Sequence, residues 1–503
     1  MIRRWKLRLL AAVLAAVGAG STPSQLHAHD SGMGLVRYNT DGSLDAGFGH
    51  GGVVAERTVQ GGLSPEALVI QTSGNIVLAG TSSDLGTAAV GFGLARYNPD
   101  GSLDTSFGSG GRVLTRIGAA TAEAHAVALQ PDGDLLVAGS GFAAASAPSS
   151  FALARYTPDG TLDPSFGTGG VVLSPISANG AEARGIALQS NGRIVVAGTA
   201  FATGATNDAL ALARYNADGS PDLSFASGSG GVVLTSFDPS GTEPGSSPVR
   251  TAALVLQADG KLAAVGSVGG HQGAFALARY VPAGDLDSGF GPAGMGKVVT
   301  LAPVSAQAYA AAVQPDGDIL VAGGLGSASD SAAFAIARYR PNGDLDASFG
   351  SGGFVTTSFD GGGSGVHALA VDGDGRIAAV GSGYAPAPAS PGAVNGGFAV
   401  VRYRPNGTPD PGFGQAGVVL TTVGDAGSMP AALAVQGDGK LVAAGLTYFL
   451  VPNPNDRLTG VLVVLVPVLA VLAVLAVLAL VSRVVVSRRR RIGRGPAPSP
   501  PVR

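Results

Sequence analysis

Seven copies of one short unit predict an all-β protein folded as a seven-bladed β-propeller. The dipeptide Arg-Tyr recurs at 37, 96, 155, 214, 279, 338 and 402, so the period is 59 residues apart from two longer spacings of 65 and 64. A second landmark, Val-Ala-Gly or a close variant, ends at Gly80, Gly139, Gly198, Gly266, Gly323, Gly381 and Gly445. A fixed period of this length is typical of folds in which each unit buries its faces against its neighbours. The repeats therefore form one body rather than the several domains that 503 residues would allow.

Each unit contains two hairpins. In the second unit, FGLARY-NPDG-SLDTSFG places two extended segments around a turn in which Pro99 presets the first position and Gly101 accepts a left-handed backbone. The sequence AHAVALQ-PDG-DLLVAGS repeats this pattern around Pro131, Asp132 and Gly133, with segments that are apolar on both faces. Such segments are typical of strands buried inside a multi-sheet body. Four short strands in each of seven units, without a helical pattern, predict seven propeller blades.

The order of the hairpins predicts how the ring closes. The repeats begin with an outer-type hairpin (35–52) and end with an inner-type hairpin (431–445). We therefore expect Leu433–Leu446 to pair, within one sheet, with strands around Val36–Val54, which removes a free sheet edge. The alternative is an open solenoid, in which these segments lie in separate sheets.

The repeat resembles a known family. Units of the type F-A-L-A-R-Y-x-P-D-G-x-L-D-x-S-F-G-x-G-G-x-V, followed by A-L-Q-P-D-G-x-I-L-V-A-G, are similar to delta-60 repeats, a bacterial propeller-type repeat. The clearest matches are Phe151–Val171 with Ala187–Gly198, and Phe334–Val355 with Ala368–Gly381. The resemblance covers about residues 35–449 and implies an exported repeat protein; it supplies no catalytic residues.

Composition excludes several classes of function. The 31 basic and 34 acidic residues give a net charge of −3, so nothing in the charge balance favours nucleic acid as a partner. The absence of Cys excludes a disulfide scaffold, thiolate zinc sites and a Cys nucleophile. The turn containing Asp372 and Asp374 lacks the 12-residue calcium loop with its terminal Glu. We therefore expect no cofactor and no metal.

The two ends of the chain carry membrane-targeting features. Residues 1–28 read as a signal peptide, with Arg3, Arg4 and Lys6 before a short apolar stretch; an uncleaved anchor is the alternative. After the propeller (33–449) and a linker (450–459), residues 460–482 are long and apolar enough for a transmembrane helix.

The arginine-rich tail (483–503) predicts the orientation of that helix. Positive charges stay on the cytoplasmic side, so the propeller is expected outside the cytoplasmic membrane, or at the cell surface. A cleaved sorting signal is the alternative to a permanent anchor.

The most regular charged residues are predicted to be structural. Every Arg of the Arg-Tyr dipeptide has an Asp eight residues later, which the hairpin turn places on the opposite strand. The pairs are Arg37/Asp45, Arg96/Asp104, Arg155/Asp163, Arg214/Asp222, Arg279/Asp287, Arg338/Asp346 and Arg402/Asp410. A cross-strand ion pair fixes the register of a hairpin, and a ligand site would rarely be copied into every blade.

One position differs from blade to blade. Five residues before the Gln, or its equivalent, that ends each first inner strand, the occupants are Glu66, His125, Arg184, Ala252, Tyr309, His367 and Ala431. This position is expected near the mouth of the central channel, where propellers usually bind ligands. The polar members, Glu66, His125, Arg184, Tyr309 and His367, are therefore candidate binding residues. The alternative is that they are solvated residues at the loop-to-strand junction.

These features predict an exported, membrane-tethered propeller that acts as a noncatalytic surface binding or scaffolding module. Its ligand would be a glycan, a peptide or another component of the cell envelope. The alternative is a secreted hydrolase or lyase with its site at the channel mouth, built from the same five residues. A third possibility is a structural element of the envelope that needs no pocket.

Overall fold

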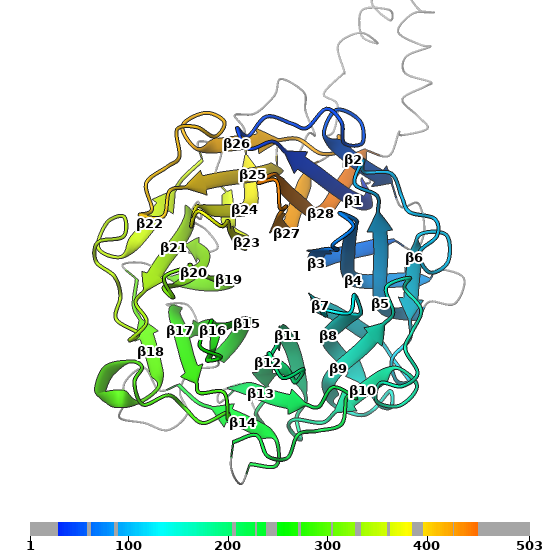
Figure 1. Ribbon diagram of the computed structural model, residues 1–503, viewed down its shortest axis with the longest axis vertical. Coiled ribbons are helices and arrows are strands. Elements are labelled where there is room, and N and C mark those ends of the chain that lie inside the picture. Colours follow the sequence, from blue (N-terminus) through cyan, green and yellow to red (C-terminus); the bar gives the residue numbers. More distant parts are fainter. Residues whose placement is uncertain are drawn as a thin grey trace, which may run out of the picture. The chain divides into compact units, whose positions relative to one another are not determined.

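Seven small antiparallel sheets stand around a common axis (Figure 1). The computed structural model describes residues 29–57, 62–84, 89–203, 208–226, 229–237, 249–269, 273–302, 305–326, 333–359, 363–384, 396–425 and 427–450. Within these residues, each sheet has four strands, which confirms the predicted all-β, seven-bladed β-propeller.

Each blade consists of four strands, ordered from the axis outward. Blade one is β3 (Leu63–Ile70), β4 (Ile76–Asp84), β5 (Ala89–Tyr97) and β6 (Arg112–Thr115); blade two is β7 (Ala122–Leu129), β8 (Leu135–Phe142), β9 (Ser149–Tyr156) and β10 (Val171–Ser174); blade three is β11 (Ala181–Leu188), β12 (Ile194–Ala200), β13 (Ala209–Tyr215) and β14 (Val232–Thr235). Blade four is β15 (Val249–Leu256), β16 (Leu262–Val268), β17 (Ala274–Tyr280) and β18 (Lys297–Thr300), with a 3₁₀ turn, η2 (Pro292–Gly294), before β18; blade five is β19 (Ala306–Val313), β20 (Ile319–Leu325), β21 (Ala333–Tyr339) and β22 (Phe354–Thr357). Blade six is β23 (Gly363–Val371), β24 (Ile377–Tyr384), β25 (Gly396–Tyr403) and β26 (Val418–Thr421); blade seven is β27 (Ser428–Val435), β28 (Leu441–Leu450), β1 (His29–Tyr38) and β2 (Val53–Arg57).

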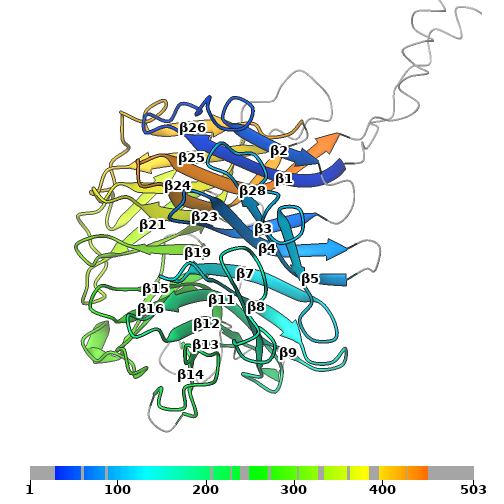
Figure 2. The same cartoon turned by 45° about the vertical axis from the view of Figure 1, so that its right-hand side comes forward.

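Blade seven closes the ring with strands from both ends of the repeat region. Its order is β2-β1-β28-β27, so β1 lies between its own hairpin partner and a strand about 400 positions later in the chain (Figure 1, Figure 2). This is the closure predicted from the hairpin order, and it excludes the open solenoid. The first and last repeats therefore share one sheet and leave no blade incomplete.

The hydrophobic core consists of layers between neighbouring blades. Phe334 of blade five packs with Ile377 of blade six, and Val442 of blade seven packs with Ile76 of blade one. Seven such clusters join each blade to the next around the ring. Because each sheet is covered by its neighbours on both faces, its inner strands are apolar on both faces, as the sequence pattern indicates.

The outer hairpin of each blade ends in the turn predicted from its sequence. In blade one, the amide of Asn98 donates to the carbonyl of Ser102 (2.8 Å) and Gly101 has φ of +86°, a conformation that glycine adopts without strain. We call the end of the ring that carries these seven turns, at 39–43, 98–102, 157–161, 216–220, 281–285, 340–344 and 404–408, the turn face.

At the turn face, each arginine of the Arg-Tyr dipeptide contacts three groups. Arg155 Nε donates to Asp163 Oδ2 (2.7 Å), its guanidinium lies over the ring of Phe166 (4.9 Å to the centroid), and Nη1 donates to the carbonyl of Ala217 in the next blade (2.7 Å). The other six arginines, Arg37, Arg96, Arg214, Arg279, Arg338 and Arg402, repeat this arrangement with their own Asp, Phe and next-blade carbonyl. The structure thus adds an inter-blade contact to the cross-strand pair expected from sequence.

At the opposite end, every innermost strand contains a β-bulge. In β7 the register passes from Ala124 opposite Gly139 to Ala126 opposite Ala138, so no residue of β8 lies opposite His125. The same shift occurs in the other six innermost strands at Glu66, Arg184, Ala252, Tyr309, His367 and Ala431. We call these seven positions the bulge positions and the end of the ring that carries them the bulge face.

The glycine of each Val-Ala-Gly motif makes room for the bulge. A Cβ atom on Gly323 would lie well inside van der Waals contact with the carbonyl oxygen of Gln307, on the adjacent strand. The other six motif glycines face a backbone carbonyl in the same way. The glycines that mark the repeat in the sequence are therefore required by the backbone that presents the bulge positions.

The predicted membrane-targeting segments lie outside the described residues. These are the signal peptide (1–28), the transmembrane helix (460–482), the basic tail (483–503) and all of the linker (450–459) after its first residue. Within the part of the chain that is described, no helix has the length and apolarity to cross a bilayer.

The close approach at the motif glycine predicts a large, local loss of stability on substitution. Gly323→Ala forces a methyl group against the Gln307 carbonyl and should lower the free energy of unfolding by about 3 kcal/mol. Gly373→Ala is the control, because a Cβ atom there meets open space. Denaturant unfolding measures both variants, and equal stabilities would contradict the role assigned to the glycine.

The aspartates of the turn face predict acid sensitivity. Burial alone would raise the pKa of Asp346, but hydrogen bonds from Ser348 and Arg338 outweigh it and hold this pKa well below its usual range. A depressed carboxyl pKa stabilises the fold above the unfolded value of about 4, and this contribution is lost as the pH falls further. The stability difference between wild type and Asp346→Asn should therefore be largest near neutral pH and shrink below about pH 4.

Unfolding free energies measured at a series of pH values test this expectation. Asp374→Asn is the control, because that carboxylate is exposed and pairs with Arg376, two residues further along the same turn. It should change stability by less than about 0.5 kcal/mol throughout. A difference for Asp346→Asn that stays constant from pH 7 to pH 2 would refute the argument.

Candidate functional site

The seven bulge positions carry side chains that differ between blades. A bulge takes its extra residue out of the regular ladder and re-aims its side chain. Because all seven bulges occur at the same point of the innermost strand, the seven side chains lie around the axis at the bulge face. The polar bulge residues form two groups, one in blades one to three and one in blades five and six.

The first group is centred on His125 of blade two. Its Nδ1 atom lies 3.4 Å from Arg184 Nη1 and 4.0 Å from Glu66 Oε2. Its Nε2 atom lies 3.0 Å from Glu182 Oε1, and the imidazole is only 5% exposed. Glu182 also forms an ion pair with Arg184. The structure therefore brings together three of the five polar residues selected from sequence, one from each of three successive blades.

The pKa values of Glu66 and Glu182 are shifted in opposite directions. Partial burial raises the pKa of Glu66, although the charges of His125 and Arg184 oppose the shift. Burial would also raise the pKa of Glu182, but the imidazole of His125, 3.0 Å away, and the charge of Arg184 outweigh it and lower that pKa. Glu182 is thus the stronger anion and the carboxylate that holds Arg184 and His125 in place.

The second group is an aromatic pair in blades five and six. The rings of Tyr309 and His367 lie with their centroids 5.7 Å apart and are tilted by 50°. Burial lowers the pKa of His367, while a hydrogen bond with the backbone of Pro430 acts in the other direction. The hydroxyl of Tyr309 donates to Gln307 Oε1 (2.5 Å), and this tyrosine is 43% exposed.

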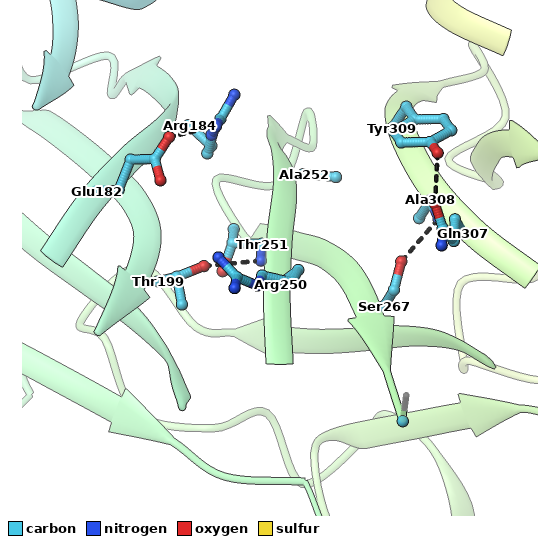
Figure 3. A pocket seen from close by; sticks show the side chains of 11 residues that line it. Glu182, Arg184, Thr199, Arg250, Thr251, Ala252, Ser267, Gln307, Ala308 and Tyr309 are labelled. Carbon is cyan, nitrogen blue, oxygen red and sulfur yellow. Dashed lines mark hydrogen bonds and ion pairs between the residues drawn. The ribbon is translucent and has the colours of Figure 1, made fainter. Parts of the chain in front are cut away.

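A cavity of about 450 Å³ lies between the two groups, in blades three to five. Arg184 is on one side of it, Tyr309 is on the other, and Ala252, the bulge residue of blade four, lies between them (Figure 3). The remaining lining residues are Glu182, Thr199, Arg250, Thr251, Ser267, Gly269, Gln307 and Ala308. Its size falls within the range of about 300–1,000 Å³ that is typical of small-molecule sites.

Six polar lining residues were not selected from the sequence, and three of them share one position in the repeat. Glu182, Arg250 and Gln307 each precede a bulge position by two residues. Glu123 occupies the same place in blade two, with its Oε2 atom 3.9 Å from His125 Nε2. This position also varies between blades, with Ser64, Gly365 and Met429 in blades one, six and seven. Because side chains two apart on a strand share a face, a second variable position in step with the first could have identified them.

The geometry suits binding more than acid–base chemistry. Both nitrogens of His125 lie near side chains of its own group, and little of the ring is exposed to accept a substrate. Within the described residues, no three His, Asp or Glu side chains are placed to hold a metal ion together. The cavity instead offers cationic, hydroxyl, amide and aromatic groups, which recognise a polar ligand.

Comparison with known proteins supports the assignment of the repeats to a β-propeller. It assigns no activity or ligand. The family described as "Domain of unknown function (DUF5122) beta-propeller" matches residues 30–48, 71–107, 130–166, 189–225, 257–290, 314–349 and 373–413. These segments include the Arg, Asp and Phe of every turn-face contact, and all seven bulge positions lie outside them. No curated protein matches the chain.

Solved structures match this chain only at low similarity. A protein of unknown function from Dyadobacter fermentans DSM 18053 is 10% identical, with 82% of this chain and 98% of that chain covered and a TM-score of 0.42. A polysaccharide lyase of family PL25, an ulvan lyase, is 11% identical (73% and 79% covered, TM-score 0.35). An α-L-arabinofuranosidase from Fusarium graminearum is also 11% identical (64% and 91% covered, TM-score 0.35). Similarity at this level carries no argument about function.

The pKa values of Glu66 and Glu182 are shifted in opposite directions, and this predicts the order in which the two carboxyls titrate. With selectively ¹³C-labelled glutamate, the carboxyl of Glu66 should titrate above its ordinary pKa and that of Glu182 below it. Arg184→Gln should raise the pKa of Glu182, because it removes a stabilising positive charge. Carboxyl NMR measures both midpoints, and a Glu182 midpoint above that of Glu66 would contradict the assigned roles.

Proposed function

We propose that this chain is an exported, membrane-tethered binding module whose β-propeller takes its ligand at the bulge face, near the mouth of the central channel. The observation that carries the proposal is the division of the repeat: the seven bulge positions hold five different residue types, whereas the turn-face contacts recur in all seven blades. A surface that is built by the same backbone seven times but carries different side chains is suited to recognition rather than to holding the fold together.

The remaining parts of the proposal rest on the sequence. We propose that the units are delta-60 repeats, that residues 1–28 direct export, and that residues 460–482 anchor the propeller outside the cytoplasmic membrane with the tail inside. The expected ligand is a glycan, a peptide or another envelope component, and no nucleic acid is expected, because the net charge of −3 provides no basic surface in excess.

A secreted hydrolase or lyase is the second candidate. One observation favours it: His125 and Glu182 are 3.0 Å apart, which is within the reach of an acid–base pair. The burial of His125 weighs against this candidate, since a general base needs access to the proton that it abstracts. We therefore place the binding function first.

A binding screen with the full-length protein in mild detergent tests the proposal. Glycan, peptidoglycan-fragment and peptide arrays should identify a ligand whose binding is weakened at least about 10-fold by His125→Ala or His367→Ala, because His125 positions Arg184 and Glu182 and His367 packs against Tyr309. His50→Ala is the matched control, because His50 is exposed in a turn between β1 and β2, far along the blade from the bulges. A ligand that is turned over by the wild type would favour the enzyme instead.

The proposed membrane orientation is tested separately by protease protection. Protease added to intact cells should digest the propeller but spare an epitope placed after residue 483. Protection of the propeller in intact cells would overturn the exported arrangement.

A further inference from the structure

We propose that the cavity between blades three, four and five binds a carboxylated saccharide, a uronic acid unit, with Arg184 and Arg250 facing its carboxylate and Tyr309 packing against its ring. This inference rests on the proposed binding function and names the chemical class of the ligand. It is drawn from the walls of the cavity, which differ in charge and in polarity (Figure 3).

One wall of the cavity is cationic. Arg184 and Arg250 line it from neighbouring blades, against a single carboxylate, Glu182. Arg184 already pairs with Glu182, yet 39% of its side chain remains exposed. Arg250 is exposed, and within the described residues no carboxylate lies at ion-pair distance from its guanidinium, which lies over the ring of Phe201, 5.7 Å from the centroid. The wall therefore has a guanidinium available for an anion, and a guanidinium binds a carboxylate through two parallel hydrogen bonds.

The opposite wall is aromatic and rich in hydrogen-bonding groups. Tyr309 presents an exposed ring, and its hydroxyl is fixed by the side-chain oxygen of Gln307, which leaves the amide hydrogens of Gln307 available as donors. Ser267 Oγ accepts from the amide of Ala308 (2.8 Å), so its own hydrogen remains available as a donor. A sugar has both an apolar ring face and hydroxyl groups, and these two surfaces match the ring of Tyr309 and its polar neighbours.

The space between the walls exists because blade four has a small bulge residue. Ala252 occupies the position at which blades three and five carry Arg184 and Tyr309, so the cavity opens over its methyl group (Figure 3). Blade seven also has alanine at its bulge, Ala431, which does not line this cavity. The chain therefore offers a matched pair of positions, one inside the cavity and one outside it.

A saccharide fits this site better than an extended peptide does. A peptide strand would bind by adding to the free edge of an innermost strand, which requires a regular ladder of backbone groups. The bulges at Arg184, Ala252 and Tyr309 interrupt that ladder in all three blades that form the cavity. Recognition must then come from side chains, and these are the cationic, amide, hydroxyl and aromatic groups already described.

Titration calorimetry on the full-length protein in mild detergent tests the inference. The probes are galacturonate and glucuronate trisaccharides, the same trisaccharides after reduction of their carboxyl groups, and a penta-glutamate peptide. We expect an acidic trisaccharide to bind at least about 10-fold more tightly than its carboxyl-reduced form, as the loss of a charge-assisted contact predicts. Arg250→Gln should weaken the acidic probe to the level of the reduced one.

Two further variants separate the cavity from the rest of the molecule. Ala252→Leu fills the cavity and should abolish binding, whereas Ala431→Leu adds the same side chain at the bulge of blade seven and should leave binding unchanged. Arg404→Ala removes an exposed arginine at the turn face and should also leave binding of the trisaccharide unchanged. A circular dichroism melt of each variant establishes that it is folded.

The outcomes distinguish this inference from the proposed function. Equal binding of acidic and reduced trisaccharides, no effect of Arg250→Gln, or tighter binding of penta-glutamate would overturn the saccharide assignment. If no uronate binds but another ligand is lost on His125→Ala, the assignment falls and the proposed binding function stands. If no ligand of any class binds, both fall.

Discussion

The contact between each turn-face arginine and three partners holds the ring together. The aspartate fixes the arginine on its own hairpin, the phenylalanine ring supports the guanidinium, and the carbonyl of the next turn joins it to the neighbouring blade. Arg402 makes the same contact across the closure, to the carbonyl of Thr40 (2.6 Å), so the joint between the two ends of the repeat region resembles the other six. The guanidinium is desolvated where these partners meet, which makes the loss of any one of them costly.

This constraint divides each blade into two ends with different roles. At the turn face, the same residues recur in all seven blades because the same inter-blade contact must form seven times. At the bulge face, the contact between strands is made by backbone and by the motif glycine, so the bulge side chain is not needed for packing. That freedom is what lets Glu66, His125 and Tyr309 occupy equivalent positions, and it is why the candidate site lies at this face.

Much of the fold could be predicted from the sequence, and less of the site. The spacing of Arg-Tyr and Val-Ala-Gly determines the blade number, the hairpin order determines the closure, and the bulge positions are visible as variable positions. Only the aspartate partner of each arginine was predicted. The carbonyl that accepts from Arg155 could not be, because it is 62 residues away and is brought near only by stacking of blades. Arg250 and Gln307 were missed for a similar reason: their contribution depends on a cavity that three neighbouring blades form together.

The most direct test of this division compares one turn-face residue with the whole set of polar bulge residues. A variant with alanine at 66, 125, 184, 309 and 367 would match blades four and seven, which already have alanine there. Our account predicts that its free energy of unfolding, measured in denaturant, falls by less than that of the single variant Arg402→Ala, for which a loss of about 3–5 kcal/mol is expected from an unpaired buried carboxylate at Asp410. A larger loss in the five-alanine variant would contradict the central claim that the turn face stabilises the ring and the bulge face is free for recognition.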